Sequence, residues 1–87
     1  MPRISTFYGV VIYMYWNERD HPVAHFHACH GGRRASISAY GEVLAGLLEP
    51  RALKLIREWA MLRQNEILAN WERARRSEPL HGIEPLA

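Results

Sequence analysis

Two adjacent glycines near the middle of the chain constrain its fold more than any other feature. Gly31-Gly32 favours a two-residue β-hairpin turn, because both central positions of a type I′ turn need positive φ. Such a turn fixes the register of the two strands, since the flanking residues His30 and Arg33 must then lie opposite each other. Pairs counted from there are Cys29 with Arg34, Ala28 with Ala35, His27 with Ser36, Phe26 with Ile37, and His25 with Ser38.

This register separates polar pairs from apolar pairs along the whole hairpin. Successive side chains of a strand point to opposite faces, so His25, His27 and Cys29 share one face while Phe26 and Ala28 share the other. The apolar face must pack on a core. We therefore expect Phe26 to be buried and both His25 and His27 to lie on the face turned away from the core.

Further strands are predicted on both sides of the hairpin. Residues 7–16 are rich in β-branched and aromatic side chains, and residues 43–48 form a weaker candidate strand. We expect the first of these strands to lie beside the segment 25–30, with Ile12 and Met14 pointing inward.

The second half of the chain predicts helices followed by a tail. Pro50 suits a first helical position, and apolar residues then recur at helical spacing until the pattern ends near Arg76. Polar residues 63–66 interrupt that pattern, which predicts two helices or one kinked helix, with Asn65 as a candidate cap. Prolines and a glycine in residues 77–87 predict an extended tail whose apolar side chains dock on the body.

Together these elements predict one α+β domain over residues 1–87. We expect an antiparallel sheet of three or four strands within residues 7–48 and helices within residues 50–76 that cover one face of the sheet. Trp59 and Trp71 recur at helical spacing and are expected in the core.

Composition narrows the classes of protein that fit. The single cysteine, Cys29, cannot form an internal disulfide, which favours a reducing cytoplasm. No apolar run approaches the roughly 20 residues that span a bilayer, so no membrane partner is expected. The net charge is +2, and Lys54 is the only lysine among the eleven cations. The arginines favour bidentate contacts with phosphates or carboxylates and so lean slightly toward a nucleic-acid partner.

The clustered histidines allow three interpretations that the residues alone leave open. His25 and His27 could bind zinc or iron with Cys29 or His21 as a third ligand, although no cofactor is otherwise expected. They could instead act as general acid and base, because imidazole titrates near neutral pH. In the third interpretation, they only hold the hairpin and the adjacent loop together.

The acid–base interpretation implies a nucleic-acid surface on the open face of the sheet. RNA cleavage without a metal needs an acid, a base and a cation near one phosphate, and His27 is the first candidate for the proton transfer. The residues expected to contact nucleic acid are Arg33 and Arg34 at phosphates, and Tyr13 and Tyr15 against bases.

Several motifs of the chain recur together in one protein family. They are Ile4-Ser5-Thr6-Phe7-Tyr8-Gly9-Val10-Val11-Ile12, Met14-Tyr15, His21-Pro22, His25-Phe26-His27-Ala28, Ala52-Leu53, Glu58-Trp59, Glu66-Ile67-Leu68 with Trp71, and Ile83-Glu84-Pro85-Leu86. In this combination the chain closely resembles the prokaryotic family called domain of unknown function 4160. The resemblance covers nearly the whole chain. It departs from the family at Cys29-His30 and at Tyr13, where members often carry other residues.

The resemblance implies a role beside a second small protein. Genes of this family often lie next to those of another small domain, an arrangement similar to toxin–antitoxin pairs. We therefore expect a nucleic-acid-associated component of such a pair, which cleaves RNA or binds RNA or DNA through the open sheet face. The alternatives are a protein-interaction or regulatory module and a histidine-based metal-binding domain. Expected partners are a cognate small protein, nucleic acid, or a second copy paired through a sheet edge.

Overall fold

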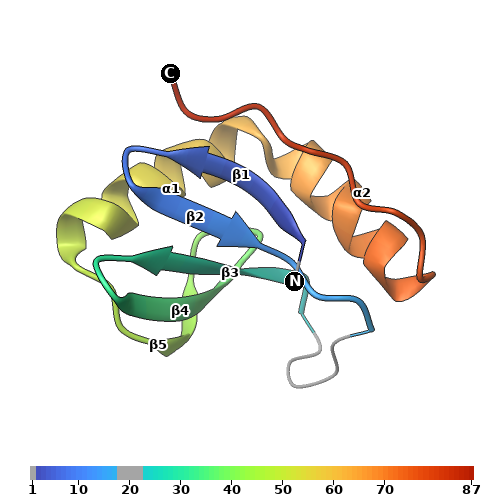
Figure 1. Ribbon diagram of the computed structural model, residues 1–87, viewed down its shortest axis with the longest axis horizontal. Coiled ribbons are helices and arrows are strands. Elements are labelled where there is room, and N and C mark those ends of the chain that lie inside the picture. Colours follow the sequence, from blue (N-terminus) through green and yellow to red (C-terminus); the bar gives the residue numbers. More distant parts are fainter. Residues whose placement is uncertain (1, 18–22) are drawn as a thin grey trace.

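The computed structural model describes residues 2–17 and 23–87. Over these residues the chain forms a five-stranded antiparallel sheet, in which each strand pairs with the next, followed by two helices (Figure 1). The strands are β1 (Arg3–Phe7), β2 (Val10–Tyr13), β3 (His25–His30), β4 (Arg33–Ser38) and β5 (Val43–Gly46). The helices are α1 (Pro50–Leu62) and α2 (Gln64–Arg75). The α+β class is confirmed, whereas the expected three or four strands are five.

The additional strand is β1, which lies almost entirely before the segment predicted as a strand, residues 7–16, while β2 accounts for the middle of that segment. β1 ends at Phe7 and β2 begins at Val10, and the two strands pair through a turn at Tyr8 and Gly9. Both turn residues have positive φ, 49° at Tyr8 and 78° at Gly9. An aromatic residue seldom adopts such a backbone, so Tyr8 hides the turn from a prediction based on residue preferences.

The predicted hairpin register is confirmed at every pair between β3 and β4, from His30 opposite Arg33 to His25 opposite Ser38. The turn glycines have φ of 57° and 78°, as a type I′ turn needs. The prediction that the preceding strand lies beside β3 is also confirmed, because Ile12 of β2 pairs with Ala28. Ile12 and Met14 are buried, as expected.

The core lies between the sheet and the helices. Trp59 of α1 is fully buried, and its ring centroid lies 5.4 Å from that of Phe7 and 5.4 Å from that of Phe26. Aromatic side chains of this size contribute a large share of core energetics, and the tilted and edge-on contacts are favourable geometries. Trp71 of α2 is 9% exposed, so both tryptophans belong to the core as predicted.

One residue separates the two helices. Arg63 lies between them with φ −114° and ψ 21°, outside helical geometry, and no side chain caps α2. The expected cap, Asn65, is wrong because α2 begins one residue earlier, at Gln64. The polar stretch marks the break correctly but not the first residue of the helix.

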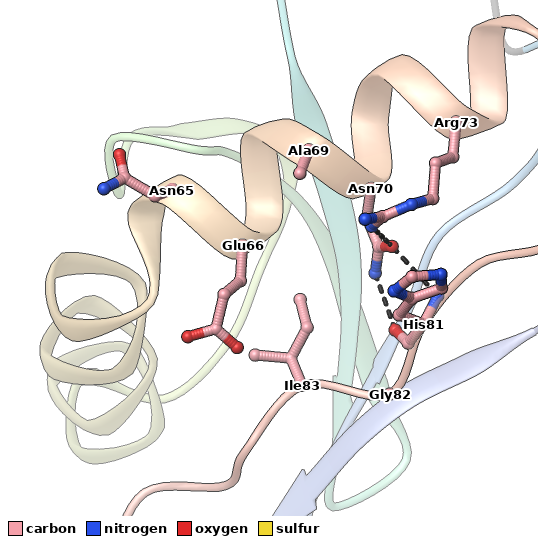
Figure 2. A pocket seen from close by; sticks show the side chains of 8 residues that line it. All are labelled: Asn65, Glu66, Ala69, Asn70, Arg73, His81, Gly82 and Ile83. Carbon is pink, nitrogen blue, oxygen red and sulfur yellow. Dashed lines mark hydrogen bonds between the residues drawn. The ribbon is translucent and has the colours of Figure 1, made fainter.

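The C-terminal tail is extended and docks against α2 through a buried amide, as Figure 2 shows. Asn70 is fully buried; its Nδ2 donates to the carbonyl oxygen of His81 at 2.8 Å, and its Oδ1 accepts the backbone N–H of His81 at 3.0 Å. Arg73 donates a further hydrogen bond from Nη1 to Oδ1 at 2.8 Å. One side chain thus satisfies both backbone groups of a tail residue.

Two further contacts continue this docking toward the sheet. The N–H of Ile83 donates to the carbonyl oxygen of Ile4 in β1 at 2.7 Å, and the indole N–H of Trp59 donates to the carbonyl oxygen of Glu84 at 2.9 Å. Ile83 itself is buried. The tail therefore closes the core beside α2 and along the edge of β1.

Candidate functional site

The face of the sheet turned away from α1, here called the outer face, carries a row of side chains that crosses all five strands. Arg3 pairs with Tyr13, Tyr13 with His27, His27 with Ser36, and Ser36 with Ala45. Residues directly opposite each other in an antiparallel sheet point to the same face, so these five side chains lie side by side on the outer face.

Arg34 lies next to this row and helps to form a hollow on the outer face. It is two residues from Ser36 on the same strand and therefore points to the same side. The hollow has a volume of about 210 Å³ and is lined by His27, Arg34, Ala35, Ser36, Ala45 and Gly46. The structure thus brings together the predicted His27 and Arg34, with Tyr13 beside them in the row.

Gly46 allows β5 to approach β4 closely enough to complete this hollow. Its φ is 86°, and a Cβ atom at this position would lie 2.8 Å from the Cα atom of Ala35. Real Cβ atoms do not come that close to a neighbouring backbone. Glycine is therefore required here both for its backbone conformation and for the space it leaves.

The imidazole of His27 is half-buried and is held from two sides. Its Nδ1 lies 3.3 Å from the hydroxyl oxygen of Ser36, and its ring meets the ring of Tyr15 edge-on, with 4.6 Å between the centroids. Tyr15 and Tyr13 are themselves half-buried. Contacts of this kind restrict the orientation of the imidazole, which is what a binding or proton-transferring group needs.

The expectation that His25 is exposed is wrong, because His25 is fully buried. Its ring packs against Trp71 of α2, with 4.9 Å between the centroids, and lies 5.4 Å from the ring of His27. Its Nδ1 lies 2.9 Å from the carbonyl oxygen of Val23 and donates to it, since a carbonyl can only accept. Strand alternation predicts the direction of a side chain but not that a helix covers it. Phe26 is buried, as predicted.

Ser38, the residue opposite His25 in the hairpin, is also buried, and its hydroxyl stabilises the turn that follows β4. Its hydroxyl oxygen accepts hydrogen bonds from the backbone N–H groups of Tyr40 and Glu42, at 3.2 and 3.1 Å. Ser38 therefore has a structural role in the turn between β4 and β5. The rest of the predicted polar face is more accessible, since His27 and Ser36 are half-buried and Arg34 is exposed.

The two neighbouring arginines expected at phosphates point to opposite sides. Arg33 pairs with His30 and so lies on the side of the sheet that carries Ala35 and Ile37, at the end of the hairpin. Arg34 lies on the outer face. Of the two, only Arg34 is placed near His27.

The sheet carries positive charge without any balancing carboxylate of its own. The five strands that the structure describes contain three arginines and three histidines but no Asp or Glu. Arg3 and Arg34 supply the fixed positive charge of the outer face. A surface of one sign attracts ligands of the opposite sign, and its field is stronger where side chains line a concavity.

The residues named for a metal site are only partly described. His21 lies outside the described residues, and Cys29 is half-buried beside Arg34 in the adjacent strand. Within residues 2–17 and 23–87, no three or more His, Cys, Asp or Glu side chains gather closely enough to hold a metal ion.

A second polar pair, which the sequence did not reveal, lies at the opposite end of the hairpin from His25. His30 Nδ1 lies 3.1 Å from Oε2 of Glu49, the residue that precedes α1. These residues are distant in sequence, and no spacing rule connects a hairpin turn to a helix start. The nearest sequence signal is Pro50, which marks where α1 begins.

Comparison with known proteins gives one match. A family model described as Domain of unknown function (DUF4160) matches residues 9–72, well over half of the chain. No curated protein and no solved structure matches. In the part of the chain that the structure describes, neither helix has the length and apolar character needed to cross a membrane.

Proposed function

The chain belongs to the family of domain of unknown function 4160, and we propose that it binds single-stranded nucleic acid across the outer face of its sheet. The observation that carries this proposal is the outer-face row with Arg34 beside it. Cations, an aromatic ring and an imidazole lie next to one another there, on strands without a carboxylate. Positive grooves combined with aromatic platforms are the common basis of single-strand binding.

The dimensions of the row suit a short stretch of single strand. Neighbouring strands of a sheet lie about 4.8 Å apart, so the row from Arg3 to Ser36 extends over roughly 14 Å. In the proposed complex, Arg3 and Arg34 contact phosphates, and Tyr13 stacks on a base. His27 and Ser36 offer hydrogen-bonding groups to a base edge or a 2′-hydroxyl.

Binding is favoured over RNA cleavage because the two candidate imidazoles are not equivalent. His27 lines the outer-face hollow, whereas His25 is fully buried and its Nδ1 donates to a backbone carbonyl. Cleavage through an acid–base pair of imidazoles needs both at the phosphate. We therefore assign His25 a positioning role behind His27.

The binding proposal can be tested by fluorescence anisotropy with a labelled, unphosphorylated single-stranded RNA at two salt concentrations. Arg34→Ala is expected to weaken binding several-fold and to lower the salt slope by about one, because one phosphate contact is lost. Tyr13→Ala is expected to weaken binding about tenfold through the loss of stacking. Lys54→Ala, which removes an exposed cation from α1, serves as the matched control and should change little.

Two results would contradict the proposal. The first is the absence of salt-dependent binding in the wild-type chain. The second is an equal loss of affinity in Arg34→Ala and Lys54→Ala, since this would reflect net charge rather than a defined surface. Release of labelled fragments that stops in His27→Ala would instead favour cleavage.

A second candidate function is the binding of a cognate small protein through β5. Within the described residues β5 pairs with β4 on one side only, and Val43 and the adjacent Leu47 are 37% and 67% exposed. An edge strand with exposed apolar residues can accept a strand from another chain. Co-purification with the neighbouring gene's product tests this. Val43→Lys should abolish it, while Met61→Lys, on the exposed surface of α1, should not.

A further inference from the structure

The β1–β2 turn, the β3–β4 turn and the start of α1 lie at one end of the molecule (Figure 1). Residues from these three segments line a cavity of about 500 Å³. This volume falls within the range of small-molecule sites in proteins. The residues that line the cavity are Tyr8, His30, Glu49, Arg51, Ala52 and Leu55. They come from the two turns and from the first turns of α1, whereas the outer-face hollow is lined by β3, β4 and β5.

The centre of this cavity is the pair formed by His30 and Glu49. The 3.1 Å contact joins His30 Nδ1 to Glu49 Oε2, and the two side chains are 28% and 42% exposed. Glu49 occupies the N-cap position of α1, but its carboxylate makes no capping hydrogen bond. The carboxylate instead lies against one edge of the His30 imidazole, whose other edge, with Nε2, faces the turn at Gly9.

A cation and an aromatic ring lie on either side of this pair. Arg51 is exposed in the first turn of α1, where the unpaired backbone N–H groups of a helix also favour negative charge. Tyr8 is 60% exposed at a position whose φ of 49° is unusual for an aromatic residue. Ala52 and Leu55 add apolar surface. The cavity therefore combines an anion-binding corner with a flat stacking surface.

The charges in the cavity favour an anionic ligand. Among the fixed charges of the lining, the guanidinium of Arg51 offsets the carboxylate of Glu49, so that any further cation at this end of the molecule gives an excess of positive charge. Arg33, directly opposite His30 in the hairpin, adds a second cation near the same end. Arginine binds phosphate oxygens through two parallel N–H groups.

We propose that this cavity binds a terminal phosphate attached to a nucleobase, as in a nucleoside monophosphate or the phosphorylated end of a nucleic-acid strand. Arg51 and His30 contact the phosphate, and Tyr8 stacks on the base. The proposal does not depend on the outer face, because none of its residues lies in the outer-face row.

The test is titration of the full chain with AMP, adenosine, inorganic phosphate and a 5′-phosphorylated trinucleotide, followed by NMR chemical shifts of the backbone. AMP, the phosphorylated trinucleotide or both should shift the amides around Tyr8, His30 and Arg51, while adenosine should not. Arg51→Ala should weaken the binding of AMP at least about tenfold. Arg75→Ala, at the exposed end of α2, is the matched control and should leave AMP binding unchanged.

A second variant separates the base from the phosphate. Asparagine tolerates positive φ, so Tyr8→Asn should keep the turn. The variant should weaken the binding of AMP about tenfold while changing the binding of inorganic phosphate less than about twofold. Binding of the trinucleotide without AMP would identify a strand end as the ligand. Equal binding of AMP and adenosine, or shifts confined to other surfaces, would overturn the proposal. These results are independent of whether unphosphorylated RNA binds the outer face through Arg34.

Discussion

Replacement of Asn70 by alanine tests how the tail is attached to the body. The substitution removes two hydrogen bonds to the backbone of His81 and one from Arg73. A hydrogen bond contributes about 1 kcal/mol net, so the loss comes to about 3 kcal/mol. Alanine regains roughly 0.5 kcal/mol because it favours helix more than asparagine does. Asn70→Ala should therefore lower the free energy of unfolding by about 2.5 kcal/mol.

Thermal and urea denaturation followed by circular dichroism measure this loss. For a chain of this size, about 1 kcal/mol corresponds to roughly 4–8 °C in Tm, so a fall of about 10–20 °C is expected. Asn65→Ala is the control, because Asn65 lies on the same helix and lines the same pocket between α2 and the tail as Asn70, but is exposed (Figure 2). A difference between the two variants below about 1 kcal/mol would refute the reasoning that the buried amide holds the tail.

Three further predictions concern stability and use the same denaturation measurements. Gly46→Ala should destabilise the fold by about 3 kcal/mol or more, because a Cβ atom there would overlap the backbone of β4. The control Gly82→Ala should be nearly neutral, because no atom lies near its Cβ position. Equal losses of stability in the two variants would contradict this. His25→Ala should cost about 2–4 kcal/mol and His27→Ala less than about 1, since only the first is fully buried; the reverse order would disprove the assignment. Trp59→Phe should lower the free energy of unfolding by about 1–3 kcal/mol, because the indole hydrogen bond to the tail is lost and the ring is smaller. An unchanged stability would argue against that hydrogen bond.

The sequence predicts the fold correctly where turn residues and strand alternation determine the structure. The turn at Gly31-Gly32 sets the register of β3 and β4, and polar and apolar residues alternate consistently with it. The turn at Tyr8 could not be predicted, because tertiary packing holds an aromatic residue in a backbone conformation that its own preference disfavours.

The candidate sites follow from the sequence only in part. Alternation places His27 and Arg34 on one face correctly, since it depends on backbone geometry. The burial of His25 depends on where α2 packs, and the contact between His30 and Glu49 depends on where α1 begins. Both are consequences of assembling distant segments, for which a single strand or helix pattern contains no information.

The two borders of the sheet are unequal, and this limits how copies of the chain can associate. Along β1, the hydrogen bond from Ile83 to Ile4 occupies part of the border, whereas β5 pairs with β4 alone among the described strands. A subunit with one vacant border can join one other subunit and then stops growing. Removing residues 78–87 would also free the part of the β1 border that Ile83 covers, and a sheet with two free borders has the geometry that permits open-ended association, as in fibrils.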